Sequence, residues 1–593
     1  MILNNKNLKN IIFLYFICFV IGFFIFSVGV QAASLGEQVD FFVDSQYDIT
    51  GRTQLTATLK IIGEYVYFYI DDEYWNNLNG LSKNSLRETL EELADEFDQV
   101  IYPKERAVFG SEWSPGIDND IRITVLVSEL VDSAGGYVNI YDEYPKAEIS
   151  SSNEREMIYM NTLAIFSQEN KSFLAHEFQH LISFYQKTVL YDIEEDIWLN
   201  EARSEYAPTV CGYNDVYRSS YLADKVDIFL DEPSDPLAEW KNKLSDYGAV
   251  TLFMEYLTNH YGDDIVTKMI LNNKVGIESI NDALSSLGYD KSFSDVFTDW
   301  AIANYLNDCS IGDNNEYCYL GDLTYQRLNV DYSASYSGFP NLIVSRSSSI
   351  KDWSPQWYRF RQGSVQETDK DTLKLEFIGS ANNGDFQVPY IIEQGASKIV
   401  NFMSLDDYQQ STVYIPNFTS LNKSIVMIPI NQYKKSGFTK DDASSFFSFN
   451  ASSVSDVPII EDDDNEEEDD KPIISYPEGS LLRAIGDYKV YIIKGKYKRW
   501  IQTAEIYNHY GHLTWDDIIN VNPSVLAGYQ EAWMIRADGD KKVYELNADG
   551  TKHWINMTAE QFVLTGHKWD MVYIVNDWER DFYNTGADVM YAG

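Results

Sequence analysis

Five consecutive residues in the first half of the chain, H-E-F-Q-H at positions 176–180, have the types and the spacing that hold a metal ion. Residues at i and i+4 lie on one face of an α-helix, so His176 and His180 can present imidazole nitrogens to the same ion. Glu177 lies beside them, where its carboxylate can act on a water molecule instead of binding the metal. The pattern predicts hydrolysis assisted by zinc. The alternative interpretation is a helix with two ordinary surface histidines.

A second segment, W-L-N-E-A-R-S-E-Y-A at residues 198–207, supplies the acidic residue that such a site still needs. It follows His180 by about twenty residues, enough for a turn and a second, antiparallel helix. Catalytic zinc takes three protein ligands and keeps a fourth position open for water, so Glu201 is the predicted third ligand. Glu205, one helical turn later, is placed to accept the other ring N–H of a ligating histidine, which we expect to be His176. The predicted cofactor is one catalytic Zn²⁺ ion.

The elements that must position these residues lie on both sides of them in the sequence. Apolar residues recur at helical spacing between positions 85 and 100, namely Leu86, Leu90, Leu93 and Phe97. Apolar and aromatic runs at 59–62, 65–70, 121–127 and 156–160 are expected to be strands, and 244–306 to be helices. This order predicts an α+β domain in which a sheet precedes the metal helix.

The second segment contains N-E-x-x-S-E at 200–205, which resembles the N-E-x-x-S-D/E segment of thermolysin-like gluzincins. Over roughly residues 100–310 the chain resembles, more narrowly, the hyicolysin group of neutral zinc metallopeptidases. The further motifs that carry this resemblance are A-G-G-Y (134–137), S-N-E-R-E-M-I-Y-M-N (152–161), D-Y-G-A (246–249) and F-T-D-W-A-I-A-N-Y-L (297–306).

The resemblance implies a gluzincin-type α+β catalytic domain at residues 34–325. It also implies that residues 136–141 contribute the edge strand to which an extended substrate adds, with an ordinary buried strand or loop as the alternative. The chain departs from the family at Ala202-Arg203, where Gly and a small or apolar residue would be expected. This departure bears on packing and specificity, because neither residue is a metal ligand.

The predicted reaction needs a proton acceptor and a hydrogen-bond donor besides the zinc ligands. Glu177 is the predicted general base, which takes a proton from water and passes it to the leaving amine. The oxyanion needs a donor, and Tyr247 is the predicted one, with a core aromatic residue as an equally favoured alternative. His260 is expected to cap a helix instead.

The N-terminus has the pattern of a targeting segment. Lys6 and Lys9 precede an apolar run at 11–30, followed by V-Q-A at 30–32. We expect a signal peptide at residues 1–32, with an uncleaved membrane anchor as the alternative because the run is long. The net charge of −45 would repel phosphates, which excludes nonspecific nucleic-acid binding as the default. The predicted location is extracellular, either secreted or associated with the cell surface.

Cysteines and short acidic pairs leave further alternatives. Cys309 and Cys318 bracket a short polar loop, so a local disulfide is expected in an exported protein. For Cys211 a buried free thiol is favoured over a thiolate that caps the zinc. Calcium sites are conceivable at D-N-D (118–120) or D-D (263–264), although such pairs are usually solvated turns.

The rest of the chain divides into three parts. Short alternating strands predict a β-sandwich domain at residues 330–455. Residues 461–470 contain nine acids in ten, so 456–477 are expected to form an acidic, disordered linker. Beyond it G-D-x-K-V-Y and K-x-W-I recur after about 54 residues, which marks a tandem repeat module with copies at 478–535 and 536–593. Each copy is expected to form a β-hairpin, a short helix and another strand.

The repeats resemble the attachment or carbohydrate-binding appendages of exported bacterial enzymes, which implies a cell-surface polymer as ligand. Trp500 and Trp554 are candidate platforms for it, although core positions are favoured for both. The leading interpretation is a secreted zinc endopeptidase that acts on protein or peptide substrates. The alternatives are a surface-attached binding or adhesive protein with vestigial catalysis, and a zinc amidase that acts on cell-wall peptides. The intact ligand set with Glu177 argues against vestigial catalysis.

Overall fold

The computed structural model is a mixed α+β structure with several separate sheets. Its first compact unit contains residues 33–309, 314–330 and 436–440, and its second contains the rest of the described chain. The predicted signal peptide and, apart from Tyr476, the predicted linker lie outside the described residues. None of the described helices combines the length and the apolar composition that a membrane span requires. The structure describes residues 33–590 except 313, 322, 324, 325, 327, 364–369, 422, 456–475, 477, 478, 485–488, 511, 512, 514, 522–524, 527, 528, 548, 549 and 566.

Six strands form the sheet of the first unit, in the order β1-β2-β3-β4-β6-β5. The central strands β3, β4 and β6 run parallel and are buried along their whole length, which is typical of a sheet covered on both faces. β5 pairs antiparallel with β6 and forms one edge of the sheet. The strands are β1 (Gln38–Phe42), β2 (Gln54–Ile62), β3 (Val66–Asp71), β4 (Ile123–Ser128), β5 (Gly136–Tyr137) and β6 (Met157–Asn161).

A helical segment between β3 and β4 confirms the spacing prediction for residues 85–100. After the short α2 (Asp72–Asn77), the helix α3 (Gly80–Glu96) continues through a π-helical turn (Phe97–Ile101) into α4 (Tyr102–Phe109). The N-cap of α3 is Asn79, whose side chain accepts two backbone N–H groups of the first turn. All four apolar side chains predicted for the inner face of this helix are buried.

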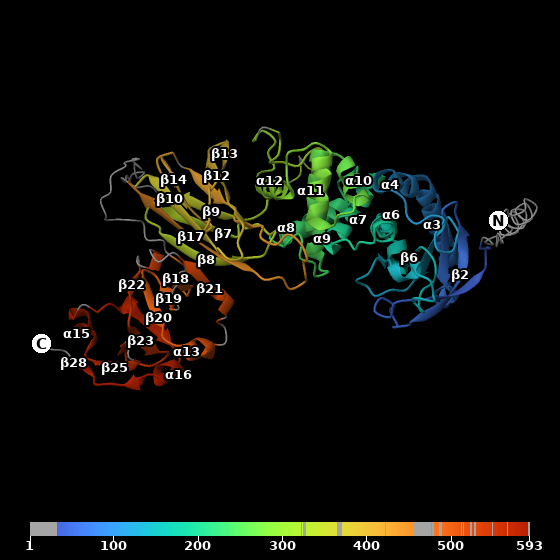
Figure 1. Cartoon of the computed structure of the whole chain (residues 1–593). Helices are drawn as coiled ribbons and strands as arrows, with labels where there is room; N and C mark the ends of the chain where they lie inside the picture. Colours follow the sequence, from blue (N-terminus) through green and yellow to red (C-terminus); the bar gives the residue numbers. More distant parts are fainter. Residues whose placement is uncertain are drawn as a thin grey trace, which may run out of the picture. The chain divides into compact units, whose positions relative to one another are not determined.

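Helices dominate the rest of the first unit (Figure 1). The metal helix α6 packs against β6 on one side and α7 on another, and α7 in turn packs against α9. The two histidines and the expected third ligand therefore lie on neighbouring helices beside the sheet. These helices are α5 (Thr162–Ile165), α6 (Asn170–Ser183), a π-helical turn (Phe184–Val189), α7 (Ile197–Cys211), α8 (Tyr221–Asp231), α9 (Leu244–Tyr261), α10 (Asp264–Leu271), α11 (Gly276–Ser286) and α12 (Phe293–Leu306).

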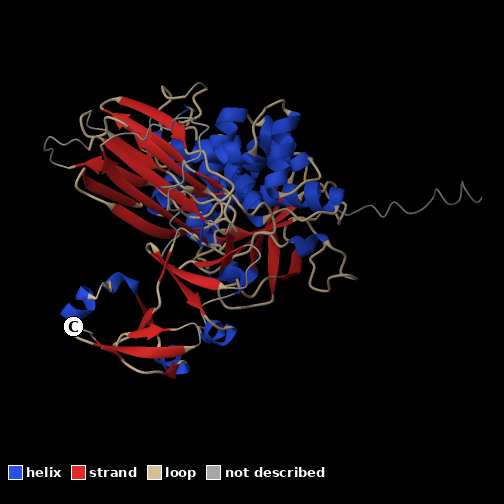
Figure 2. Ribbon diagram, turned by 60° about the vertical axis from the view of Figure 1, so that its left-hand side comes forward, coloured by secondary structure: helices blue, strands red, loops and turns tan. Residues whose placement is uncertain are grey.

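Two sheets of the second unit share one apolar core. One has the order β14-β10-β17-β8 and the other β13-β12-β15-β9-β7, and buried residues of both belong to the same cluster, as in a sandwich. The described part of this region has no helix, and its strands are drawn in red in Figure 2. The strands are β7 (Ala334–Phe339), β8 (Val344–Ile350), β9 (Tyr358–Gln362), β10 (Thr372–Gly379), β11 (Phe386–Gln387), β12 (Pro389–Gln394), β13 (Ser397–Phe402), β14 (Gln410–Ile415), β15 (Ser424–Met427), β16 (Ile430–Asn431) and β17 (Ser445–Val454).

The two repeat copies have the same topology. Their sheets run β21-β18-β19-β20-β22 and β26-β23-β24-β25-β27, and in each the first strand pairs parallel with the strand after the helix. Each copy contains the expected hairpin, helix and strand, together with a first strand that the sequence pattern did not predict. Because that strand, β23, begins at Met534, the second sheet begins before position 536. The elements are β18 (Leu481–Ala484), β19 (Val490–Lys494), β20 (Tyr497–Ile501), α13 (Ala504–His509), β21 (Ile518–Val521), β22 (Gln530–Glu531), β23 (Met534–Ala537), β24 (Tyr544–Leu546), β25 (Thr551–Asn556), α15 (Ala559–Leu564), β26 (Val572–Val575), α16 (Asp577–Phe582), β27 (Asn584–Thr585) and β28 (Val589–Met590).

The repeat copies are joined by a shared core and a buried ion pair. Residues of both copies belong to one apolar cluster. Arg499 Nη1 lies 2.5 Å from Glu579 Oε1, and both side chains are almost fully buried. The Tyr573 hydroxyl donates to backbone carbonyls of the first copy at 3.0 and 3.1 Å. The two copies therefore pack as one body.

Trp500 and Trp554, candidate platforms for which the sequence favours core positions, are half-buried, and each carries a lysine ammonium over its ring, at 4.7 and 4.3 Å. All thirteen tryptophans of the chain lie among the described residues, and the two exposed ones are Trp515 and Trp569, at 52% and 51%. They are separated by 54 residues and so occupy equivalent positions in the two copies. The exposed tryptophans of the repeats therefore occur in both copies, at residues other than the candidates Trp500 and Trp554.

Candidate metal centre

The apolar faces of helix α6 are buried, and this burial orients the two predicted histidine ligands, which lie on its remaining face. Leu174, Phe178 and Ile182 are completely buried, and the Phe178 ring packs edge-on against Phe97 of the preceding helical segment, with 5.0 Å between ring centroids. This packing fixes the rotation of α6 about its axis. The side chains of positions 176 and 180 consequently face α7 instead of solvent.

The structure brings the three predicted metal ligands together. His176 Nε2 lies 3.2 Å from His180 Nε2, and Glu201 Oε2 lies 3.5 and 3.7 Å from these two nitrogens. Bonds of about 2.0–2.2 Å to a tetrahedral zinc ion would separate its ligand atoms by about 3.3–3.6 Å. Glu201 Oε2 is buried and has no hydrogen-bond partner within the described chain. The two nitrogens and one oxygen therefore fit zinc in both number and spacing.

The structure also places Glu205 behind His176, where the sequence predicts it. Glu205 Oε1 lies 3.3 Å from His176 Nδ1, and the carboxylate is almost completely buried. It accepts hydrogen bonds from Tyr221 at 2.8 Å and Thr251 at 3.0 Å, and pairs with Lys225 at 3.1 Å. Burial opposes ionisation, but Lys225 and His176 outweigh it and lower the pKa of Glu205 to about 2. A carboxylate anchored in this way can hold the His176 ring with Nε2 toward the metal.

Two residues of the N-E-x-x-S-E segment act on the second histidine, and sequence reasoning gave them no role. The Asn200 amide nitrogen lies 3.2 Å from His180 Nδ1, and Ser204 Oγ lies 3.1 Å from the same atom. The Ser204 hydroxyl also donates to Gln179 on α6, at 2.6 Å. Asn200 and Ser204 are four residues apart and so share one face of α7, and this spacing is the signal that could have identified them.

The pKa values of the two histidines are shifted in opposite directions in the metal-free protein. Burial alone would lower both pKa values. The carboxylates of Glu201 and Glu205, 3.5 and 3.3 Å from its two ring nitrogens, reverse this effect for His176 and raise its pKa to about 10. For His180 burial outweighs the nearby carboxylates and lowers the pKa to about 4.

Glu177 lies where the metal helix meets the edge strand. A Cβ atom added at Gly136 of β5 would lie 2.8 Å from the Tyr159 carbonyl oxygen and 3.2 Å from Glu177 Oε1, so only glycine fits beside this carboxylate. Burial raises the pKa of Glu177 to about 7. The carboxylate is therefore next to both the metal ligands and the strand edge that a substrate would reach.

Tyr247 lines the same cavity as the metal ligands, but its hydroxyl is already engaged. It donates to Asn242 Oδ1 at 2.8 Å. Its ring packs against Trp240 and lies under Lys225, with 4.9 Å between each partner and the ring centre. A second tyrosine, Tyr47 from the loop between β1 and β2, also lines the cavity. Sequence reasoning missed Tyr47 because it lies in a loop without periodicity or motif.

The cavity has a volume of about 310 Å³ and extends from the edge strand past the metal ligands to the turn after α6. Residues of β5 and of the segment after it line one part of the cavity, and the charged residues Lys187, Glu194 and Glu195 line another. The residues that line it are Tyr47, Gly136, Tyr137, Val138, Ile140, His176, Glu177, His180, Ser183, Phe184, Lys187, Thr188, Glu194, Glu195, Ile197, Asn200, Glu201 and Tyr247.

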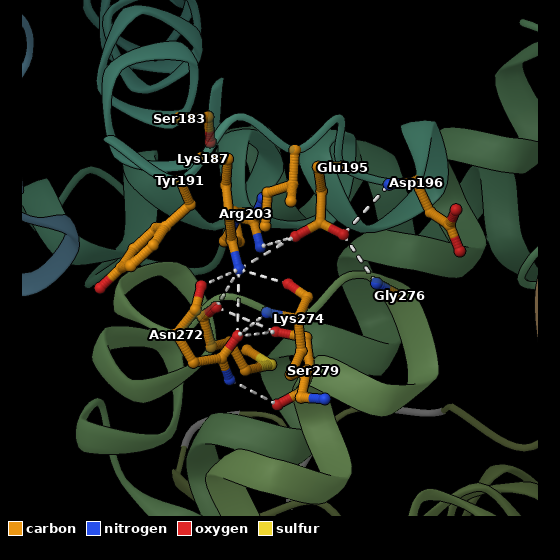
Figure 3. Close-up of polar contacts among 12 residues, drawn as sticks. Ser183, Lys187, Tyr191, Glu195, Asp196, Arg203, Asn272, Lys274, Gly276 and Ser279 are labelled. Carbon is orange, nitrogen blue, oxygen red and sulfur yellow. Dashed lines mark hydrogen bonds and ion pairs between the residues drawn. The ribbon is translucent and has the colours of Figure 1, made fainter. Parts of the chain in front are cut away.

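A buried lysine fixes the charged end of the cavity (Figure 3). Figure 3 shows dashed contacts radiating from the Lys187 ammonium, which donates to the carbonyl oxygens of Met269, Asn272 and Lys274 at 2.6, 3.0 and 2.7 Å. It also donates to the Asn272 side chain at 3.2 Å and lies 3.7 Å from Glu195 Oε2. Burial and the neighbouring Arg203 lower its pKa to about 8. Lysine here caps the carbonyl end of α10.

Glu195 connects this lysine to α7. Its carboxylate accepts from Arg203 Nη1 at 2.8 Å and from the backbone N–H of Gly276 at 2.7 Å. Arg203, one of the two residues at which the sequence departs from the hyicolysin pattern, is completely buried on α7, two residues after the predicted ligand Glu201. The network therefore sets the position of α7 relative to the end of α6. The departure at Ala202-Arg203 thus has a packing role.

The remaining candidates do not join the metal site. Cys211 is buried and free, with its thiol 3.9 Å from Glu105 Oε1, and the predicted Cys309–Cys318 disulfide is formed. The side chains at 118–120 and 263–264 make ordinary turn and hydrogen-bond contacts. Within the described chain the trio of His176, His180 and Glu201 is the only group of three such residues whose ligand atoms could hold one metal ion. His260 lies at the end of α9 and contacts the Cys318 carbonyl oxygen at 2.9 Å.

Comparisons with known proteins add little. No protein-family model and no curated protein matches the chain. One solved structure that aligns with it is described as a family GH115 4-O-methyl-α-glucuronidase with specificity for decorated arabinogalactans. The identity is 9% and the TM-score 0.12, and the alignment covers 56% of this chain and about half, 52%, of that one. A TM-score this low supports no statement about fold or activity.

Proposed function

We propose that the protein is a secreted zinc endopeptidase of the gluzincin type, similar to the hyicolysin group. The observation that carries the proposal is the fit of His176, His180 and Glu201 to one tetrahedral ion, with Glu177 beside them and Glu205 behind His176. Structural zinc sites usually have four protein ligands, whereas three ligands leave room for water. Three ligands next to a carboxylate in an open cavity favour a hydrolase.

In this proposal each residue of the candidate site has a defined role. Zinc held by the trio would act as a Lewis acid and lower the pKa of water. Glu177 accepts a proton from water and later gives it to the leaving amine, so the same carboxylate serves as base and then as acid. Glu205, and Asn200 with Ser204, hold the two imidazole rings in place.

The edge strand β5 suits an extended peptide as substrate. It pairs on one side with β6 and forms the end of the sheet on the other, and its first residue, Gly136, lies against Glu177. A peptide that adds to this edge would form main-chain hydrogen bonds and pass directly beside the general base. This arrangement favours an endopeptidase that accepts an extended stretch of chain.

The test combines metal analysis with two substrates. The purified mature protein should contain one zinc ion per chain and cleave denatured casein at internal bonds, seen as new N-termini by mass spectrometry. A chelator should abolish cleavage, and added zinc should restore it. Release of peptides from peptidoglycan without cleavage of casein would favour the amidase instead. Bound zinc with no hydrolysis of either substrate would favour the binding protein with vestigial catalysis.

The tandem repeats would hold the enzyme to a cell-surface polysaccharide through Trp515 and Trp569. Each indole stacks on a ring from the preceding helix, Tyr507 at 4.4 Å and Phe562 at 4.3 Å, and so is supported from behind. An exposed aromatic face offers a flat surface for the C–H groups of a sugar ring. Two such faces on one body suit a polymer with a repeated unit, because the second contact is intramolecular.

Replacing both exposed tryptophans by alanine is expected to weaken sedimentation of the full chain with purified cell-wall sacculi by about 10-fold or more, because avidity is lost. Each single variant should weaken it less. Val563→Ala, which removes another exposed apolar side chain of the repeats, serves as the control. Equal sedimentation of the double variant and the wild type would contradict the role of these residues.

A further inference from the structure

Two tyrosines from distant parts of the chain line the cavity beside the metal ligands. Tyr247 belongs to the first turn of α9, whereas Tyr47 comes from the loop between β1 and β2, about 130 residues before the metal helix. The proposed reaction needs one hydrogen-bond donor for the oxygen of the scissile carbonyl. The surroundings of the two hydroxyls differ, and this difference indicates which of them is able to donate that hydrogen bond.

The ring of Tyr47 is held rigidly although it lies in a loop. It stacks on Tyr137 of β5, with 4.5 Å between ring centroids, and Tyr137 stacks on Tyr159 of β6 at 4.2 Å. The Tyr137 hydroxyl accepts the backbone N–H of Asp44 at 3.2 Å, and the Tyr47 carbonyl oxygen accepts the N–H of Val131 at 2.8 Å. The loop is thus tied to the edge strand through the side chain of Tyr137 and to the segment before that strand through the main chain of Val131.

The hydroxyl of Tyr47 lies among acidic groups and stays protonated. Burial, together with the charges of Asp44, Glu177 and Glu201, raises its pKa. Within the described chain this hydroxyl has no hydrogen-bond partner, so its proton is available to a ligand. By contrast, the Tyr247 hydroxyl donates to Asn242 and would have to break that bond before it could act.

We propose that Tyr47 is the catalytic hydrogen-bond donor that stabilises the negative oxygen formed when water adds to the scissile carbonyl. The inference rests on the proposed peptidase function. Its basis is a phenol fixed by stacking on the edge strand, free of protein partners, and in the same cavity as Glu177 and Glu201. No proton leaves the tyrosine: its O–H donates to the oxygen as that oxygen gains charge, and the same bond weakens when the carbonyl re-forms.

This assignment makes the N-terminal strands part of the catalytic machinery. The loop with Tyr47 connects β1 and β2, and both strands pair within the central sheet. A propeptide that is removed on activation could not supply a residue to the mature site. The region that begins at residue 34 must therefore remain attached in the active enzyme.

The test compares Tyr47→Phe with Tyr247→Phe in the full chain. Phenylalanine keeps the ring stack, so zinc content and thermal stability should match the wild type. For Tyr47→Phe we expect kcat to fall about 10²–10³-fold with little change in KM, as on loss of one oxyanion donor. Affinity for a peptide phosphonamidate, whose tetrahedral anion mimics the charged oxygen, should fall by a similar factor when measured by calorimetry. Tyr247→Phe should change both quantities by less than about threefold.

The outcomes separate the two proposals. An active wild type whose Tyr47→Phe variant keeps both kcat and phosphonamidate affinity would overturn the assignment. A loss confined to Tyr247→Phe would transfer the role to that residue. A wild type that contains zinc but cleaves no peptide and binds no phosphonamidate would instead refute the peptidase function on which the inference rests.

Discussion

Glu177→Gln is expected to lower kcat for peptide hydrolysis by about 10³–10⁴-fold while the protein still binds one zinc ion per chain. The carboxylate is not within the ligand trio, so zinc binding does not depend on it. Its loss removes the carboxylate that lies against Gly136 of the edge strand and lines the same cavity as the trio. Glutamine has nearly the same shape, so contacts with the strand are kept and the lost proton transfer is measured alone.

The control for this variant is Glu194→Gln, the same chemical change in the same cavity. Glu194 lines the far end of the cavity and is exposed. Its replacement should change kcat by no more than about threefold. Steady-state kinetics on a quenched fluorescent peptide, with zinc measured by mass spectrometry, check both results. More than a tenth of wild-type activity in Glu177→Gln would show that another group takes the proton.

Lys187→Met is expected to lower the free energy of unfolding of the first unit by about 3–5 kcal/mol. Methionine fills a similar volume but removes the ammonium donor from the carbonyl oxygens of Met269, Asn272 and Lys274. It also leaves Glu195 with one cation fewer beside it. The segments around α6, α7 and α10 are all held by contacts with this ammonium, so the packing between these helices should weaken.

Urea unfolding followed by far-UV circular dichroism measures this effect, because the long helices of the described chain all lie in the first unit. The matched control is Lys274→Met. The Lys274 side chain forms an exposed pair with Glu278, and such pairs contribute little. The control should therefore shift the free energy by no more than about 0.5 kcal/mol. Equal urea midpoints for Lys187→Met and wild type would show that the buried ammonium adds no stability.

Local spacing was sufficient to predict the metal trio and its nearest supports. His176 and His180 are one helical turn apart, and Glu205 is one turn from Glu201, so helix geometry alone brings each pair to one face. The helix at 85–100, the disulfide and the hairpin, helix and strand of each repeat were predictable for the same reason. Each depends on residues that are close in sequence or on a repeated pattern.

Contacts between distant segments left no comparable signal. Lys187 meets carbonyl groups more than 80 residues away, and backbone carbonyls have no sequence signature. Tyr47 reaches the cavity only because β1 and β2 join the sheet at that point. Tyr247 was expected to lie near the ligands, and it does line the same cavity. Its hydrogen bond to Asn242 depends on a turn that sequence spacing does not reveal. Arg203 was noticed only as a departure from a family pattern.

The oxygen atoms that surround the Lys187 ammonium affect what a chelator should do to this protein. Four neutral oxygens with a carboxylate nearby are the ligand set that a dissolved calcium ion would take, yet here the cation is a side chain of the π-helical turn that continues α6. A tethered ammonium cannot dissociate, and no chelator removes it. Withdrawal of divalent ions should therefore empty the trio without releasing the end of α6 from α10. Inactivation and loss of structure, which coincide in proteins held by soluble calcium, should be separable in this one.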